Sequence, residues 1–170
     1  QYCAHYMVHN FKPLWRIHLV HHSDTKVDAT TGTRLHPLDF ITREAFAILA
    51  VFIMGAPLGF YVLYRIITIA YTYFNHANLK LPLKVDKAIS WVFISPNTHK
   101  FHHHFEEPWT NKNYGNIFSI WDRIFGTFAY GDINDVVYGL DVTDDTKSDD
   151  LGYQMMLPIK NNGKVKIKNT

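Results

Sequence analysis

Hydrophobic positions are spread unevenly along the chain, and one stretch differs from the rest. From Ala45 to Tyr64, twenty consecutive residues carry no charge, which is long enough to cross a bilayer as a helix. Gly55-Ala56-Pro57-Leu58-Gly59 interrupts the wider apolar segment and is typical of a turn. The pattern therefore predicts either a single membrane span or a helical hairpin with limbs at about Ile41–Met54 and Phe60–His76.

The charged residues around this stretch favour the hairpin. Arg43 precedes the uncharged run and three lysines follow it between positions 80 and 87, so the positive-inside rule puts both ends on the cytoplasmic side. Two features oppose this reading. The fourteen residues of Ile41–Met54 would rise only ~21 Å, which is short of a ~30 Å hydrocarbon core. Arg65 lies inside the second limb, where it must snorkel or face protein.

The remaining segments also have helical patterns. Residues 1–10 resemble an apolar helix, Thr25–Asp39 is polar and predicts a loop, and Ser95-Pro96 is a typical helix start. Together with the hairpin, these patterns predict an all-α fold. The other predicted helices run from Leu14 to about His22, from Val85 to Ile94, from Pro96 through His103, and from Ile117 to Phe125.

Length and composition suggest one domain with a tail. A chain of 170 residues suffices for a single hydrophobic core. We expect a catalytic domain over residues 1–140 and a polar C-terminal tail over residues 141–170, with a mobile basic end at Lys160–Lys168. The chain begins at Gln1 inside a patterned segment that has no charged n-region or cleavage site. We therefore interpret its start as the continuation of a longer helix and not as a signal peptide.

Charge and cysteine content exclude several classes of function. A formal net charge of +2 is too small to indicate nucleic acid as a partner, and no basic stripe with interleaved aromatic residues is present. The single cysteine, Cys3, excludes an intrachain disulfide and a cysteine-based zinc or iron–sulfur site. Eleven histidines are the unusual feature that remains.

Most of these histidines recur at helical spacing. Two trios share the spacing i, i+3, i+4 and one pair has the spacing i, i+4, so each group lies on one helix face. A ninth histidine ends the second hairpin limb. Neutral imidazole binds zinc, iron, copper and nickel, and a tetrahedral zinc takes at most four ligands, so nine candidates indicate two metal ions. In chain order the candidate ligands are His5, His9, His18, His21, His22, His76, His99, His102 and His103.

The order of these groups resembles the fatty acid hydroxylase and sterol desaturase superfamily of integral membrane di-iron enzymes. The resemblance covers residues 2–140. Besides the histidine groups it rests on the motifs His21-His22-Ser23-Asp24, Thr33-Arg34-Leu35-His36-Pro37-Leu38-Asp39, Phe74-Asn75-His76-Ala77-Asn78, Asn113-Tyr114-Gly115 and Trp121-Asp122-Arg123-Ile124-Phe125-Gly126-Thr127.

This resemblance implies a membrane helical hairpin with a cytosolic, histidine-rich helical cap in which the nine histidines hold two Fe ions. It further implies that a lipid C–H bond is hydroxylated or desaturated with O2 and electrons from a separate donor. The membrane would be a bacterial inner membrane or the endoplasmic reticulum. Asn78 is a candidate for a water-mediated contact to iron, whereas His36 and Asp39 are not assigned as ligands.

The electron source must lie outside the chain, because the sequence contains no Rossmann fingerprint and no haem-attachment motif. We expect a partner reductase, with cytochrome b5 or a ferredoxin as the carrier. Hydroxylation and desaturation begin with the same hydrogen abstraction, so the sequence leaves the reaction open. It also leaves open whether the lipid is a sterol, carotenoid, sphingoid, alkylglycerol or plain acyl chain.

Two other functions compete with this one. A membrane zinc hydrolase needs a glutamate base near its ligands, as in His-Glu-x-x-His; Glu106 and Glu107 follow the last trio, but that motif is absent. A non-catalytic metal-binding membrane protein would keep the histidines without turnover. Reductant-coupled consumption of O2 would distinguish that protein from an enzyme.

Overall fold

The computed structural model describes residues 1–160, and the regular elements in this part of the chain are helices. Within the same residues there is no strand, although one isolated bridge joins Phe93 and Phe118. The all-α prediction is therefore confirmed for residues 1–160. The predicted mobile end falls, from residue 161 onward, outside the described residues.

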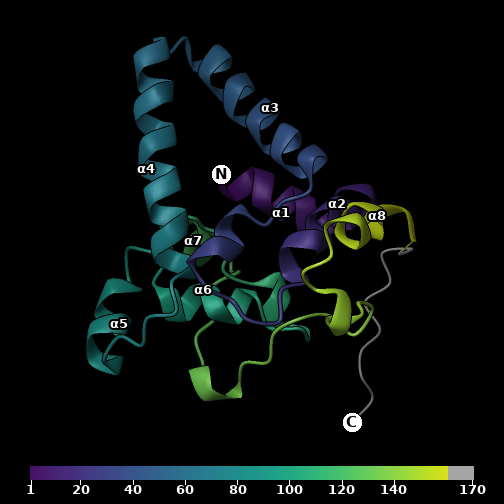
Figure 1. The fold of residues 1–170 in the computed structure, drawn as a ribbon. Helices are drawn as coiled ribbons and strands as arrows, with labels where there is room; N and C mark the ends of the chain where they lie inside the picture. Colours follow the sequence, from purple (N-terminus) through teal and green to yellow (C-terminus); the bar gives the residue numbers. More distant parts are fainter. Residues whose placement is uncertain (161–170) are drawn as a thin grey trace.

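Two long helices, α3 (Pro37–Met54) and α4 (Leu58–His76), extend from the base of the molecule and meet at a short turn (Figure 1). Gly55 ends α3 with φ 60°, a left-handed conformation that glycine adopts without steric cost. Within residues 1–160 no helix combines the length and the hydropathy needed to cross a membrane. The membrane role of this hairpin stays a prediction.

Helix α3 begins four residues earlier than predicted, inside the segment Thr25–Asp39 that was expected to be a loop. The His36 side chain accepts a hydrogen bond from the Leu38 N–H, and Pro37 occupies the first turn, where its missing N–H costs nothing. The eighteen residues of α3 therefore rise roughly 27 Å. The same segment also contains a short 3₁₀ helix, η1 (Ala29–Thr33).

Three helices gather at the base of the hairpin: α1 (Tyr2–Asn10), α2 (Lys12–His22) and α6 (Pro96–His102). Helix α6 begins at Pro96 as predicted, because the side chains of Ser95 and Thr98 each accept a hydrogen bond from the other's backbone N–H. These helices carry eight of the nine candidate ligands on their lengths or at their ends.

Two predicted helices are shorter in the structure. Helix α5 spans Leu83–Ile89 and α7 spans Ile120–Ile124, against predictions of 85–94 and 117–125. The Ile94 N–H donates to the Ile117 carbonyl at 2.8 Å, and the Ser119 N–H donates to the Val92 carbonyl at 2.9 Å. The two segments pair with each other through these bonds, so neither can continue as a helix there.

After residue 140 the chain forms one short 3₁₀ helix, Asp145–Lys147, and then α8 (Leu151–Lys160), which lies against α2 (Figure 1). Leu157 of α8 joins a buried cluster with Trp15, Leu19 and Val20 of α2 and with Leu140. Two other short 3₁₀ helices span Trp109–Asn111 and Ile133–Asp135. A domain boundary near residue 140 stays a prediction.

Candidate metal centre

The nine predicted ligands converge in two groups at the base of the hairpin, and all nine are buried. Within each group every histidine offers one ring nitrogen, and these nitrogens all lie within 4.8 Å of one another. Each trio with the spacing i, i+3, i+4 contributes to both groups. Its i and i+4 members belong to one group, and its i+3 member belongs to the other. The five-histidine group consists of His5, His9, His18, His22 and His102, and the four-histidine group of His21, His76, His99 and His103.

Backbone carbonyls orient three of the rings. The Nδ1 atoms of His5, His76 and His102 lie 2.8, 2.8 and 2.7 Å from the carbonyl oxygens of Tyr114, Thr72 and Lys112. A carbonyl only accepts, so each Nδ1 carries the proton and each Nε2 keeps its lone pair. Outer hydrogen bonds of this kind are typical of histidines that bind metals.

A carboxylate orients a fourth ring. Asp39 Oδ2 accepts a hydrogen bond from His18 Nδ1 at 2.8 Å, and the other Asp39 oxygen lies 3.2 Å from Arg43 Nε. Arg43 Nη2 is almost equidistant from the two ring nitrogens of His18, at 3.2 and 3.3 Å, so the guanidinium lies against the ring and not along one lone pair. The only sequence signal for this contact between Asp39 and His18 was the family motif Thr33–Asp39, in which Asp39 lies.

The inward-facing nitrogens fit metal ions better than they fit each other. In the four-histidine group, Nε2 of His76 lies 3.3, 3.0 and 3.2 Å from Nε2 of His21, His99 and His103. The single lone pair of His76 Nε2 cannot accept three hydrogen bonds. In the five-histidine group, buried Nε2 atoms of His5, His9, His22 and His102 have no hydrogen-bond partner in the structure. A cation in each group would satisfy these atoms.

Burial also keeps these rings in the form that binds metals. Removal from water lowers the pKa of His76 to about 4 and that of His102 to about 3. Burial likewise lowers the pKa of the seven other candidate ligands, although for His18 the Asp39 carboxylate opposes the shift. All nine rings are therefore neutral at pH 7, as coordination requires.

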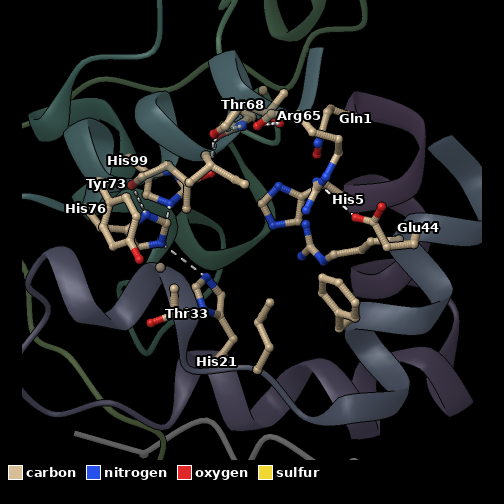
Figure 2. A pocket seen from close by; sticks show the side chains of 18 of the residues that line it. Gln1, His5, His21, Thr33, Glu44, Arg65, Thr68, Tyr73, His76 and His99 are labelled. Carbon is tan, nitrogen blue, oxygen red and sulfur yellow. Dashed lines mark hydrogen bonds and ion pairs between the residues drawn. The ribbon is translucent and has the colours of Figure 1, made fainter. Parts of the chain in front are cut away.

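A cavity of about 490 Å³ adjoins the four-histidine group and opens between α3 and α4. Figure 2 shows His21, His76 and His99 on one side of it, with Glu44 and Arg65 on the other. Arg65 Nη1 lies 2.9 Å from Glu44 Oε1, so Arg65 faces protein, which was one of its two predicted placements. Glu44 and Arg65 directly flank the uncharged run, and this symmetry about the turn could have predicted the pair.

Three polar residues near the ligands in sequence lie outside both groups. Asn78, the candidate for a water-mediated contact, is exposed beyond the end of α4 and does not line the cavity. His36 caps α3, and the Nδ1 atom of His104 accepts a hydrogen bond from the Val137 N–H. Asn75, which was not singled out, is buried and donates to Asn116.

Comparison with known proteins assigns the family. Residues 1–127 match the model of the fatty acid hydroxylase family. The chain belongs to this family. It is 30% identical over 130 residues to ornithine lipid hydroxylase OlsE of Rhizobium tropici. The matched region covers 75% of the chain and 38% of that relative. It is 31% identical over 140 residues to the alkylglycerol monooxygenase of Homo sapiens, and this match covers 82% of the chain and 30% of that relative.

A third relative is also a hydroxylase by name. A fatty acid hydroxylase, vlmA, of a Lecanicillium species is 27% identical over 140 residues, which is 75% of the chain and 38% of that relative. The chain thus spans about a third of the length of these relatives. No solved structure matches the chain. Family membership and the two histidine groups are consistent with a metal site in this chain.

Proposed function

We propose that this fatty acid hydroxylase family member is an O2-dependent di-iron enzyme that hydroxylates an unactivated C–H bond of a lipid. The convergence of nine buried, neutral histidines beside an open cavity carries the proposal. Nitrogen ligands in this number suit two iron ions. Bound iron would supply the activation of O2, a redox reaction that no side chain performs.

The residues of the chain have defined tasks in this scheme. The two histidine groups hold the ions, and the backbone carbonyls of Tyr114, Thr72 and Lys112 fix the ring orientations. The cavity places the lipid next to His76 and His99, which line it. Burial of the groups keeps bulk water away from the reaction.

The stoichiometry requires a reductant. One oxygen atom enters the C–H bond as a hydroxyl group and the other leaves as water, which consumes two electrons and two protons. We propose that cytochrome b5 or a ferredoxin, reduced by a separate reductase, delivers the electrons. The names of the relatives, hydroxylase and monooxygenase, support oxygen insertion over desaturation. They leave the lipid class unspecified for this chain.

We propose further that residues 45–64 of the hairpin enter the bilayer and that the histidine groups lie at its cytoplasmic face. The side chains at the end of the hairpin are apolar and largely exposed: Phe52 is 82% exposed and Met54 is 79% exposed. Exposed apolar patches of this kind mark interaction surfaces. Residues 1–140 would form the catalytic domain in a bacterial inner membrane or the endoplasmic reticulum.

Elemental analysis of the intact, detergent-purified protein tests the proposal. We expect about two irons per chain, and O2 uptake that depends on both a lipid and a reductant. His103→Ala should lose iron, whereas its matched control His104→Ala should retain it, because His104 lies outside both groups. One zinc per chain would favour a hydrolase instead, and bound iron without reductant-coupled O2 uptake would favour a non-catalytic metal-binding protein.

A further inference from the structure

A group of exposed apolar side chains lies at the foot of α4, outside the hairpin. It is formed by residues 91–93, which follow α5, and by residues 118–125, which include α7. Trp91 is 67% exposed and Trp121 is 47% exposed, and Ile124 and Phe125 are exposed as well. We call the exposed side chains of these two segments the tryptophan face. Clusters of large apolar side chains on a protein surface mark places of interaction.

Ring contacts join the two segments to each other and to the hairpin. The Phe93 ring stacks on the Phe118 ring with centroids 5.5 Å apart, and on the Tyr71 ring of α4 with centroids 6.1 Å apart. The Arg123 guanidinium lies over the Trp91 ring, 4.4 Å from its centroid. These contacts hold the tryptophan face against the C-terminal half of α4 (Figure 1).

The tryptophan face continues into the outer surface of the hairpin. Leu63 and Ile67 precede Tyr71 at intervals of four residues, so the three side chains follow one face of α4. Leu63 and Ile67 are both exposed, and Leu63 belongs to the uncharged run that we propose to enter the bilayer. A membrane that surrounds this face of α4 would therefore reach the tryptophan face at its boundary.

The chemistry of the tryptophan face and its surroundings suits the boundary of an anionic bilayer. An indole ring combines an apolar body with an N–H donor, and tryptophan is enriched where hydrocarbon meets water. The preceding segment carries three exposed lysines, Lys80, Lys84 and Lys87. The acidic residues of segments 80–93 and 117–125 are Asp86 and Asp122, and both are fully buried. The exposed charge is therefore positive, which complements anionic lipid head groups.

We propose that the tryptophan face lies in the head-group layer of an anionic bilayer and anchors the histidine-rich base of the molecule there. This goes beyond the proposed function, which places only residues 45–64 in the bilayer, and it requires neither iron nor turnover. A second copy of the chain fits the surface less well. In a symmetric dimer through this face, the lysines of one copy would approach those of the other and repel them.

Quenching of fluorescence by brominated lipid tests the proposal, because the hairpin contains no tryptophan. The four tryptophans of the chain are Trp15, which is buried, Trp109, and the two of the tryptophan face. The intact protein is reconstituted into vesicles of phosphatidylcholine and phosphatidylserine, with bromine on the acyl chains of the phosphatidylcholine. Its emission should be lower than in the same vesicles without bromine, and the loss should come from Trp91 and Trp121.

Conservative variants assign the quenched emission. Trp91→Phe and Trp121→Phe should each remove a large part of it, and the double variant nearly all of it. Trp109→Phe makes the same change in the 3₁₀ helix Trp109–Asn111, outside the tryptophan face, and should leave the quenched emission in place. Quenching that survives in the double variant would overturn the proposal. Emission that brominated lipid does not quench would also overturn it, since protein would then cover the face.

A lysine variant tests the charge of the partner. A cation near an anionic membrane surface contributes about 1 kcal/mol, a factor of about five in affinity. Lys84→Gln should therefore reduce quenching in vesicles that contain phosphatidylserine and not in phosphatidylcholine alone. Lys26→Gln is the control, because Lys26 is exposed and its neighbour Thr25 lies against Gly139, far along the chain from the tryptophan face. Equal effects of the two changes would overturn the anionic partner.

A tryptophan in the hairpin separates this inference from the membrane placement in the proposed function. Phe52→Trp, added to the double variant Trp91→Phe/Trp121→Phe, reports the end of α3. Quenching of this tryptophan, together with unquenched Trp91 and Trp121 in the parent protein, would retain the inserted hairpin and overturn the anchoring of the base. Conversely, quenched Trp91 and Trp121 in a protein without iron or O2 uptake would support the anchor and overturn the hydroxylase.

Discussion

Asp39 Oδ2 lies 2.8 Å from His18 Nδ1, and both side chains are fully buried. Burial by itself would favour the protonated carboxyl group, but Arg43 and His18 beside it hold the pKa of Asp39 well below its usual range. Asp39 is therefore anionic, and it accepts the Nδ1 proton of His18. This leaves Nε2 of His18 as the nitrogen available to the five-histidine group, the arrangement of a carboxylate–histidine–metal triad.

Asp39→Asn should weaken metal binding by about 10–100-fold, because the amide keeps the shape of the side chain but loses the charge that holds His18. Competition against a chelator of known affinity measures the effect. Asp149→Asn makes the same change at an exposed position of the C-terminal segment and should bind metal like the parent protein. Unchanged affinity in Asp39→Asn would show that Asp39 does not position the ligand.

Gly32 allows η1 to approach α4 closely at the level of the histidine groups. A Cβ atom at this position would lie 2.7 Å from Thr72 Cγ2 and 3.4 Å from His76 Nδ1. Gly32→Ala should therefore destabilise the fold by about 1–3 kcal/mol, the usual cost of overpacking, and should lower metal content by displacing His76. Thermal unfolding and elemental analysis measure the two effects.

The control for this variant is Gly59→Ala in α4, the helix that Gly32 approaches. A Cβ atom at Gly59 would meet no other atom within 4 Å, and alanine is the better helix former. Stability should stay the same or rise slightly. If both glycine variants behave alike, the contact between η1 and α4 is not tight enough to matter.

Asp122 is linked to His5 through the backbone. Its carboxylate accepts hydrogen bonds from the N–H groups of Tyr114 at 2.7 Å and Gly115 at 2.8 Å, and the Tyr114 carbonyl in turn accepts the bond from His5. Asp122→Ala should cost about 1–3 kcal/mol, because buried donors lose their acceptor. Chemical denaturation measures the loss of stability, and elemental analysis should show reduced metal content per chain.

For this variant Asp149→Ala is the control, since it removes a carboxylate from an exposed position. Loss of stability with full metal content would mean that Asp122 supports the fold without positioning His5. Asp122 lies in the Trp121–Thr127 motif, so the experiment also tests why that motif accompanies the histidine groups.

The sequence predicted which histidines gather better than it predicted their surroundings. Helical spacing puts His18, His21 and His22 on one face whatever the tertiary structure, so their grouping follows from local geometry alone. The division between two groups does not, because it depends on how α2 meets α6 and α4. The ends of α5 and α7 were misplaced for a similar reason: hydrogen bonds between residues far apart in sequence, such as Ile94 and Ile117, override local helical preference.

Acid should release the metal, but only well below the ordinary histidine pKa of about 6.5. Burial lowers the pKa of His76 to about 4 and that of His102 to about 3, so the folded rings stay neutral as pH falls through 6.5, whereas those of an unfolded chain become charged. Protons displace metal only when they can bind the rings. Retention is therefore complete at neutral pH and is lost as pH falls toward the lowered values.

Iron content of the folded protein after equilibration across this pH range measures the release. We expect its midpoint to lie below about 6.5, the ordinary histidine pKa. His104→Ala should not move the midpoint, because His104 belongs to neither group. A midpoint at or above about 6.5 would mean that water reaches the histidines, which contradicts their burial.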